Sequence, residues 1–369
     1  MDRRVVSVGL GLMAAAMLSA VGSVGHEAVS ATDAPASEAA SPLVEAARFV
    51  SADAHGMLFT DWSAIKAATG NEAITSASSI DARMAALRLM ATEAAPLVTF
   101  GVAHFEGHAD VWGWDSTDLD WEASILTAGP PVAILRFREG LDLGSVLQRY
   151  RDRGFTETQH GDATVVSHEM DLGTDWVTRS DFGVLNTAFV DDGRTLVLSS
   201  GIDGVRAALE GADGVVRAEP MESVAAALGS PLTAGIEVTP NSCLAYDPRW
   251  LPGSDAGPNA DLLAEVGALH PWEGLGLGVY GAEEAPQVRF VLTYTAPDEA
   301  ATDLPGRVRL AEQAISLATG APYADSLFTV VESEVEGQTI SLGVAAVDGQ
   351  VRRVANAFIA RDLVFAACG

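Results

Sequence analysis

Lysine is nearly absent from this chain of 369 residues, because Lys66 is its only lysine and arginine supplies the rest of the 22 cationic side chains. Acidic side chains number 50, so the formal net charge is −28. A surface of that sign repels phosphate backbones and anionic lipid surfaces. We therefore expect no nucleic-acid partner.

Cysteine is equally scarce, with Cys243 and Cys368 as the only two. A small, even number of cysteines in an exported chain normally forms disulfides, and we predict that these two are paired. Because Cys368 is the penultimate residue, the bridge would hold the C-terminus in place. The alternative, a catalytic thiol, needs a neighbouring base, and the sequence shows none.

Long apolar runs are absent except at the N-terminus. Arg3 and Arg4 precede the apolar run Val5–Leu18, and small residues follow it. This is the three-part pattern of a secretory signal peptide, so we predict that residues 1–25 are removed and that the mature chain has no stable membrane insertion. Retention of Val5–Val24 as an anchor is the alternative. No cysteine lies near the end of the run, so we expect an extracellular, envelope or periplasmic protein that is not a lipoprotein.

Composition divides the remaining chain. Residues 26–42 are Ala, Ser, Pro and acidic residues, which is typical of a disordered linker. Residues 43–98 show helical patterns, and strands and hairpins follow them. A stretch rich in Pro, Gly, Asn and Asp, 240–271, marks a junction. It separates a first half, 43–240, which includes the helical N-terminal segment, from a second half, 241–369.

Capping residues predict two helices in the first half. Asp61 and Asp142 can each cap a helix that begins at the next residue. Gly70 and Gly154 then end these helices. Residues 186–200 form the clearest hairpin, because two β-rich runs flank an Asp-Asp-Gly turn.

Both halves show the same order of elements: two strands, a helix and a hairpin. They begin with Trp121-Glu122 and Trp272-Glu273. In the second half we expect a long helix over 304–319 and a last strand over 363–367. The pattern predicts an α+β fold with largely antiparallel sheets covered by helices, built from two related β-β-α-β-β halves.

Three segments carry a family resemblance: Phe59–Trp62 (FTDW), Asp120–Glu122 (DWE) and Arg136–Phe155, which holds Arg-Phe, Asp142 and Gly-Phe at its start, middle and end. They resemble a group of exported bacterial proteins of unknown function. The resemblance covers most of the mature chain and implies no activity.

A glycine motif, Gly276–Gly281, matches G-x-G-x-x-G. Dinucleotide binding needs a helix directly after the motif, whereas residues 282–286 carry two carboxylates and lead into another strand. We therefore interpret the motif as a strand with one bare face, which a helix can approach closely.

The densest polar stretch is 104–122. His104, His108 and Asp110 are candidate metal ligands, although H-x-E-x-H is not the order of zinc metalloproteases. Carboxylate oxygens make calcium the alternative cofactor, although their spacing departs from the EF-hand loop. These carboxylates are Asp115, Asp118, Asp120 and Glu122. No other cofactor is expected.

Two tryptophans in this stretch are candidate ligand contacts. Trp112 and Trp114 would share one face of a strand and form a stacking platform for a sugar or peptide, with Asp118 and Asp120 as polar partners. The alternative is an aromatic pair that faces the core.

No serine-hydrolase elbow, phosphate loop or Cys-His metal cluster occurs in the sequence. We expect a non-catalytic binding module or a structural module of the envelope, with a small molecule, a sugar or a protein as its ligand. The alternative is an extracellular hydrolase or metal-dependent enzyme with its site near 104–122. The sequence carries no signal for the oligomeric state.

Overall fold

The computed structural model describes part of the chain, in one compact unit that begins at Ala40. The described residues are 40–93, 97, 105–169, 184–214, 219–238, 242–246, 257–281 and 287–368. The predicted signal peptide, residues 1–25, and most of the predicted linker, 26–42, lie outside them. Among the helices of the described residues, none has the length and apolar character needed to cross a membrane.

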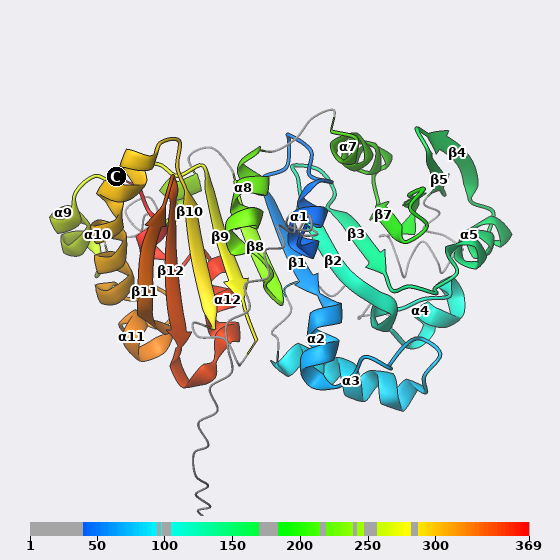
Figure 1. Ribbon diagram of the computed structural model, residues 1–369, viewed down its shortest axis with the longest axis horizontal. Helices are drawn as coiled ribbons and strands as arrows, with labels where there is room; N and C mark the ends of the chain where they lie inside the picture. The colour runs from blue at the N-terminus through cyan, green and yellow to red at the C-terminus, as the bar shows by residue number, and fades with distance from the viewer. Residues whose placement is uncertain are drawn as a thin grey trace, which may run out of the picture. The chain divides into compact units, whose positions relative to one another are not determined.

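Twelve strands of the described chain form one sheet, and each pairing is antiparallel. In Figure 1 the strands follow one another across the view from β11 to β4. Their order is β11 (Phe328–Glu336), β12 (Thr339–Ala346), β10 (Val288–Thr293), β9 (Gly274–Val279), β8 (Thr233–Glu237), β1 (Gly56–Asp61), β2 (Leu119–Leu126), β3 (Val132–Phe137), β7 (Thr195–Ser199), β6 (Asn186–Phe189), β5 (Ala163–Ser167) and β4 (Thr156–His160).

Helices pack on the sheet, which confirms the predicted α+β class. They are α1 (Pro42–Ala47), α2 (Trp62–Thr69), α3 (Ile80–Glu93), α4 (Phe105–Trp112), α5 (Leu143–Asp152), α7 (Ile202–Ala212), α8 (Glu219–Leu228), α9 (Ala260–Val266), α10 (Pro297–Gln313), α11 (Tyr323–Ser326) and α12 (Val351–Ile359). Short 3₁₀ turns are η2 (Ser116–Asp118), η4 (Ser242–Tyr246), η6 (Val347–Gly349) and η7 (Val364–Ala366).

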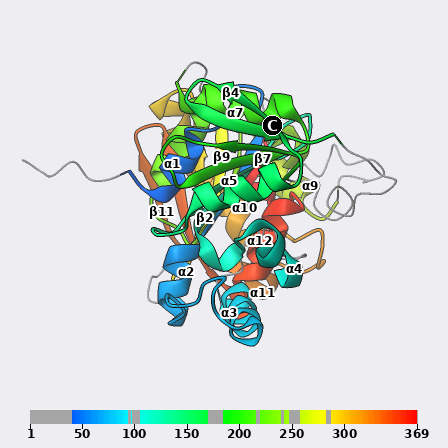
Figure 2. The same cartoon turned by 90° about the vertical axis from the view of Figure 1, so that its right-hand side faces the viewer.

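The alternation of side chains along the strands gives the sheet two buried faces. On the first face, which we call the α8 face, β1 to β3 and β8 pack against α1, α7 and α8 in one core. On the other, the α12 face, one core joins β9, β10 and β12 to α10, α12 and η7. A second core on the α12 face joins β3 and β7 to α2, α3, α4 and α5. Figure 2 shows α1 and α12 on opposite sides of the sheet.

Both capped helices follow the sequence prediction. The Asp61 carboxylate accepts a hydrogen bond from the Ala64 N–H at 2.8 Å, and α2 ends at Gly70, whose φ of 67° is left-handed. Asp142 likewise accepts from the N–H groups of Gly144 and Ser145 at the start of α5. Local hydrogen bonds of this kind depend on a few adjacent residues, so the sequence alone reveals them.

Two predictions at the N-terminal side are wrong. Residues 43–98 were expected to be helical, but Gly56–Asp61 forms β1 in the middle of the sheet, between β8 and β2. Its apolar residues alternate over only six positions between two helical segments, which hides the strand signal. Further on, Phe105–Trp112 is helix α4, where strands were expected.

The C-terminal segment also differs from the prediction, because residues 363–367 were expected to form a strand and instead contain the 3₁₀ turn η7. Side chains satisfy its carbonyl groups in place of a neighbouring strand. Arg307 donates to the carbonyl oxygens of Phe365 and Ala367, and the Trp272 indole donates to that of Ala366 at 2.7 Å. The long helix α10 begins at Pro297 and ends at Gln313, earlier than the predicted 304–319.

The predicted repetition has a counterpart in the sheet. In each half, the last strand of the C-terminal hairpin pairs with the second strand of the predicted unit. This pairs β7 with β3 in the first half and β12 with β10 in the second. The two Trp-Glu segments are not equivalent, since Trp121 lies in β2 on the α8 face and Trp272 precedes β9 in the core of the α12 face. The predicted boundary at residue 240 falls between β8 and β9, which are neighbours in the sheet.

The predicted disulfide is confirmed: Cys243 and Cys368 are bonded, with their Cα atoms 5.2 Å apart. The glycine motif begins in β9 and has the predicted bare face. A Cβ atom built on Gly274 or Gly276 would lie 2.5 Å from the Val224 side chain of α8. The motif therefore allows close packing of α8 against the sheet.

Candidate functional site

A pocket of about 450 Å³ opens on the α8 face, where β1 leads into α2. Helices α1 and α2 and strands β2 and β3 form its walls. The residues that line it are Pro42, Glu45, Asp61, Ser63, Ala64, Ala67, Asp120, Trp121, Arg136 and Arg194. Its volume falls in the range of small-molecule sites, about 300–1,000 Å³.

Strand register places the charged side chains of the pocket together. Asp61 on β1 is directly opposite Trp121 on β2, and Trp121 is opposite Arg136 on β3. Directly opposite residues of an antiparallel pair point to the same face. The pairing of β2 with β3 shifts between Leu119 and Trp121, so Asp120 is the extra residue of a β-bulge. The bulge allows consecutive residues, Asp120 and Trp121, both to line the pocket.

Both guanidinium groups in the pocket already have carboxylate partners. Arg136 pairs with Asp192 and lies 3.8 Å from Glu45. Arg194 pairs with Asp120 at 2.5 Å and also donates to the carbonyl oxygen of Phe137. These contacts fix the two arginines across the ends of β2, β3 and β7.

Asp61 differs from the other charged side chains that line the pocket, because no cationic group of the described residues lies within ion-pair distance of it. Its side chain caps α2, and the residue is 9% exposed. Burial raises the pKa of the Asp61 carboxyl, the N–H of Ala64 opposes this shift, and the nearby Asp120 charge adds to it. A buried carboxyl with a raised pKa in a pocket is a feature of many functional sites.

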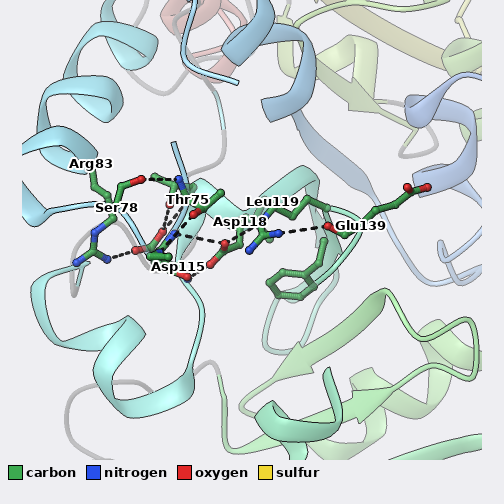
Figure 3. Close-up of polar contacts among 12 residues, drawn as sticks. Thr75, Ser78, Arg83, Asp115, Asp118, Leu119 and Glu139 are labelled. Carbon is green, nitrogen blue, oxygen red and sulfur yellow. Dashed lines mark hydrogen bonds and ion pairs between the residues drawn. The ribbon is translucent and has the colours of Figure 1, made fainter. Parts of the chain in front are cut away.

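The polar stretch predicted from the sequence forms a structural network next to this pocket. Asp115 pairs with Arg83 of α3, and Asp118 accepts hydrogen bonds from Arg138 and from the Ser76 N–H. Figure 3 shows Arg83 beside Asp115, and Asp118 next to them. Lys66 of α2 donates to the carbonyl oxygens of Thr117 and Leu119, and burial lowers the pKa of its ammonium group.

This network occupies two of the four carboxylates that the calcium hypothesis named, Asp115 and Asp118. Asp118 is fully buried and is bound to Arg138, and Asp115 is bound to Arg83. Within the described ranges, no group of three or more His, Cys, Asp or Glu side chains is arranged to hold a metal ion. Of the proposed metal ligands, His104 lies outside the described residues. His108 is buried against Trp114, and Asp110 is exposed.

The two candidate tryptophans lie in the core. Trp112, at the end of α4, is 2% exposed and packs on Tyr150 with ring centroids 4.5 Å apart. Trp114 is 0% exposed and packs edge-on against Phe137. The proposed platform required a strand, whereas Trp112 ends helix α4 and Trp114 lies just after it. The core-facing alternative describes their placement.

Of the predicted ligand residues, Asp120 alone lines the pocket, and sequence reasoning missed Arg136 and Arg194 as partners of the site. Asp61 was recognised only as a helix cap. One signal was available in the sequence. Asp61 and Arg136 are charged residues near the ends of apolar strands, and each shares a strand face with the apolar residue two positions before it. The bulge that directs Asp120 inward has no sequence signal.

No protein-family model matches the chain, and the search of curated proteins found no relative. Among solved structures, the chain is similar to crystal form I of TP0453, with a TM-score of 0.39 and 9% identity over 86% of this chain and 97% of that chain. Crystal form III of TP0453 has a TM-score of 0.38, with 9% identity over 85% of this chain and 97% of that one. Likenesses this distant carry no information about function.

Proposed function

We propose that this chain is an exported, non-catalytic binding module, and that the pocket on the α8 face receives a small ligand. The observation that carries the proposal is the convergence of both signs of charge with a buried tryptophan in one concave site. Binding sites typically combine an apolar wall with a few fixed polar groups. The disulfide supports the exported location, because such bonds persist in oxidising compartments.

The pocket is built on rigid elements, which favours binding. Asp61, Trp121 and Arg136 belong to three adjacent strands, and the arginines are held by ion pairs before any ligand arrives. A site whose side chains are already ordered loses little conformational entropy when it binds. A purely structural role in the envelope would not require this arrangement.

A blocking variant tests the proposal. Ala67 and Ala68 are adjacent residues of α2, and only Ala67 lines the pocket. We expect a ligand found by a thermal-shift screen of amines, sugars and carboxylic acids to raise the melting temperature of the wild type and of Ala68→Trp. Ala67→Trp fills the pocket and should abolish the shift. Equal shifts in both variants, or no ligand in the screen, would reject the pocket as the binding site.

One observation favours the hydrolytic alternative. Asp61, with its raised pKa, shares the pocket with a second carboxylate, Asp120. Pairs of carboxyl groups in different environments serve as acid and base in several hydrolases. Turnover of chromogenic glycosides or esters that disappears in both Asp61→Asn and Asp120→Asn would favour an enzyme over a binding module.

A further inference from the structure

The charges in the pocket disfavour an anionic ligand. Three carboxylates, Glu45, Asp61 and Asp120, face two guanidinium groups, Arg136 and Arg194. An anion that approached either arginine would have to displace a carboxylate already bound there. The loss of such an ion pair offsets the gain, so the arginines are poor anion receptors.

Asp61 is the pocket carboxylate that lacks a counter-ion within the part of the chain that the structure describes. Lys66, the only lysine of the chain, lies on α2 after Asp61 and directs its ammonium group to the carbonyl oxygens of Thr117 and Leu119. The helix cap to Ala64 satisfies Asp61 Oδ1 with a neutral donor. A buried carboxylate without an ionic partner is costly, and a ligand cation in the pocket would remove much of that cost.

Two further features favour a cation. Trp121 lies opposite Asp61 and lines the same pocket, so a cation beside the carboxylate is also next to an indole ring. Indole is the strongest aromatic partner for ammonium and guanidinium groups. The net charge of −28 also raises the concentration of cations around the chain.

We infer, on the basis of the binding role proposed above, that the pocket accepts a small organic cation, an ammonium or guanidinium compound, with Asp61 as its counter-ion. Asp61 supplies the charge, Trp121 borders the cation where it lines the pocket, and the paired arginines remain bound to their own carboxylates. The neutral part of the ligand lies toward Ala64 and Ala67.

Matched probes test this inference. Choline and 3,3-dimethylbutan-1-ol have the same shape and differ in charge, as do butylammonium and butan-1-ol, and agmatine supplies a guanidinium. Binding to the mature chain is measured by titration calorimetry at neutral pH and low salt. Asp61→Asn is the diagnostic variant, because asparagine also caps helices and the fold is retained. Asp203→Asn, an exposed position on α7, removes the same charge outside the pocket.

We expect at least one cation to bind, its neutral isostere to bind at least 10-fold more weakly, and Asp61→Asn to weaken the cation about 10- to 100-fold. Asp203→Asn should leave the affinity unchanged. Equal affinity for a cation and its isostere, or equal loss in both variants, overturns the inference. If the cations fail while a sugar or acid from the screen still binds and is blocked by Ala67→Trp, the ligand class is wrong and the binding role stands. If nothing binds, both fall.

Discussion

At the scale of single residues, the buried charges of this chain mostly hold main-chain groups. Lys66 binds two carbonyl oxygens around the start of β2, those of Thr117 and Leu119. Asp362 accepts hydrogen bonds from the N–H groups of Leu317 and Ala318. Arg307 binds three carbonyl oxygens, two of them within the three residues before Cys368. Such groups replace regular secondary structure where the backbone is irregular.

Arg307 gives the sharpest stability prediction. Its side chain is 0% exposed and also contacts Tyr294 and Asp303. Arg307→Met removes the guanidinium partner of the Asp303 carboxylate, which keeps its hydrogen bonds with His270, and leaves several carbonyl groups without their donor. We therefore expect a loss of about 3–5 kcal/mol in the free energy of unfolding. Arg309→Met is the matched control on the same helix, because Arg309 is 41% exposed in its pair with Glu265 and should cost at most about 1 kcal/mol. Urea unfolding measures both, and equal losses would contradict the assignment.

His270 predicts a pH dependence of stability. Asp303 raises the pKa of the imidazole through a hydrogen bond of 2.8 Å, and the charges of Glu299 and Asp298 act in the same direction. A raised pKa in the folded state adds stability that is fully present below the ordinary value of about 6.5 and is lost as the pH rises through the folded value. Because the side chain is 43% exposed, the effect is modest.

His270→Gln isolates this contribution, since the backbone N–H of residue 270 still donates to Asp303. We expect the wild type to have a higher free energy of unfolding than the variant at pH 5. At pH 8.5 this difference should be smaller. Denaturant unfolding across that range measures the difference. A difference that is constant, or larger at high pH, would show that the ion pair with Asp303 does not form.

At the scale of elements, prediction succeeded where the cause is local. The caps at Asp61 and Asp142 and the turn of the 186–200 hairpin depend on adjacent residues, and each element lies where expected. It failed for β1, whose partners β2 and β8 are distant in sequence, and for η7, whose carbonyl groups are bound by Arg307 and Trp272. The pocket required strand register and a bulge, neither of which a single sequence specifies.

The glycine motif provides a prediction for the packing of α8. A Cβ atom at Gly276 would lie 2.5 Å from Val224 Cγ1, and valine is stiff at χ1, so α8 would have to shift. We expect Gly276→Ala to cost about 1–3 kcal/mol through overpacking. Gly281→Ala, in the same motif, is the control, because no described atom lies within 4 Å of the position that its methyl group would occupy. Thermal unfolding compares the two, and equal melting temperatures would mean that α8 moves without cost.

At the scale of the whole molecule, one sheet crosses the boundary predicted between the halves. Strands β8 and β9 join them through five residue pairs, from Thr233 with Val279 to Glu237 with Leu275. The core of the α8 face likewise includes Phe59 from the first half and Val291 from the second. A boundary between independent domains normally has few contacts across it. The disulfide lies wholly within the second half, since Cys243 follows the predicted boundary at residue 240 and Cys368 ends the described chain.

This continuity predicts a single cooperative unfolding transition. Because strand pairing and the α8-face core both span the two halves, neither half can lose its structure without exposing apolar surface of the other. Trp272 reports on the core of the second half, and Trp112 and Trp114 report on that of the first. We expect the guanidinium midpoints from tryptophan fluorescence and from far-ultraviolet circular dichroism to coincide. They should also coincide in Trp272→Phe, after allowance for its lower stability. If wild-type fluorescence showed two transitions, and Trp272→Phe lost the one that Trp272 reports, the halves would fold independently.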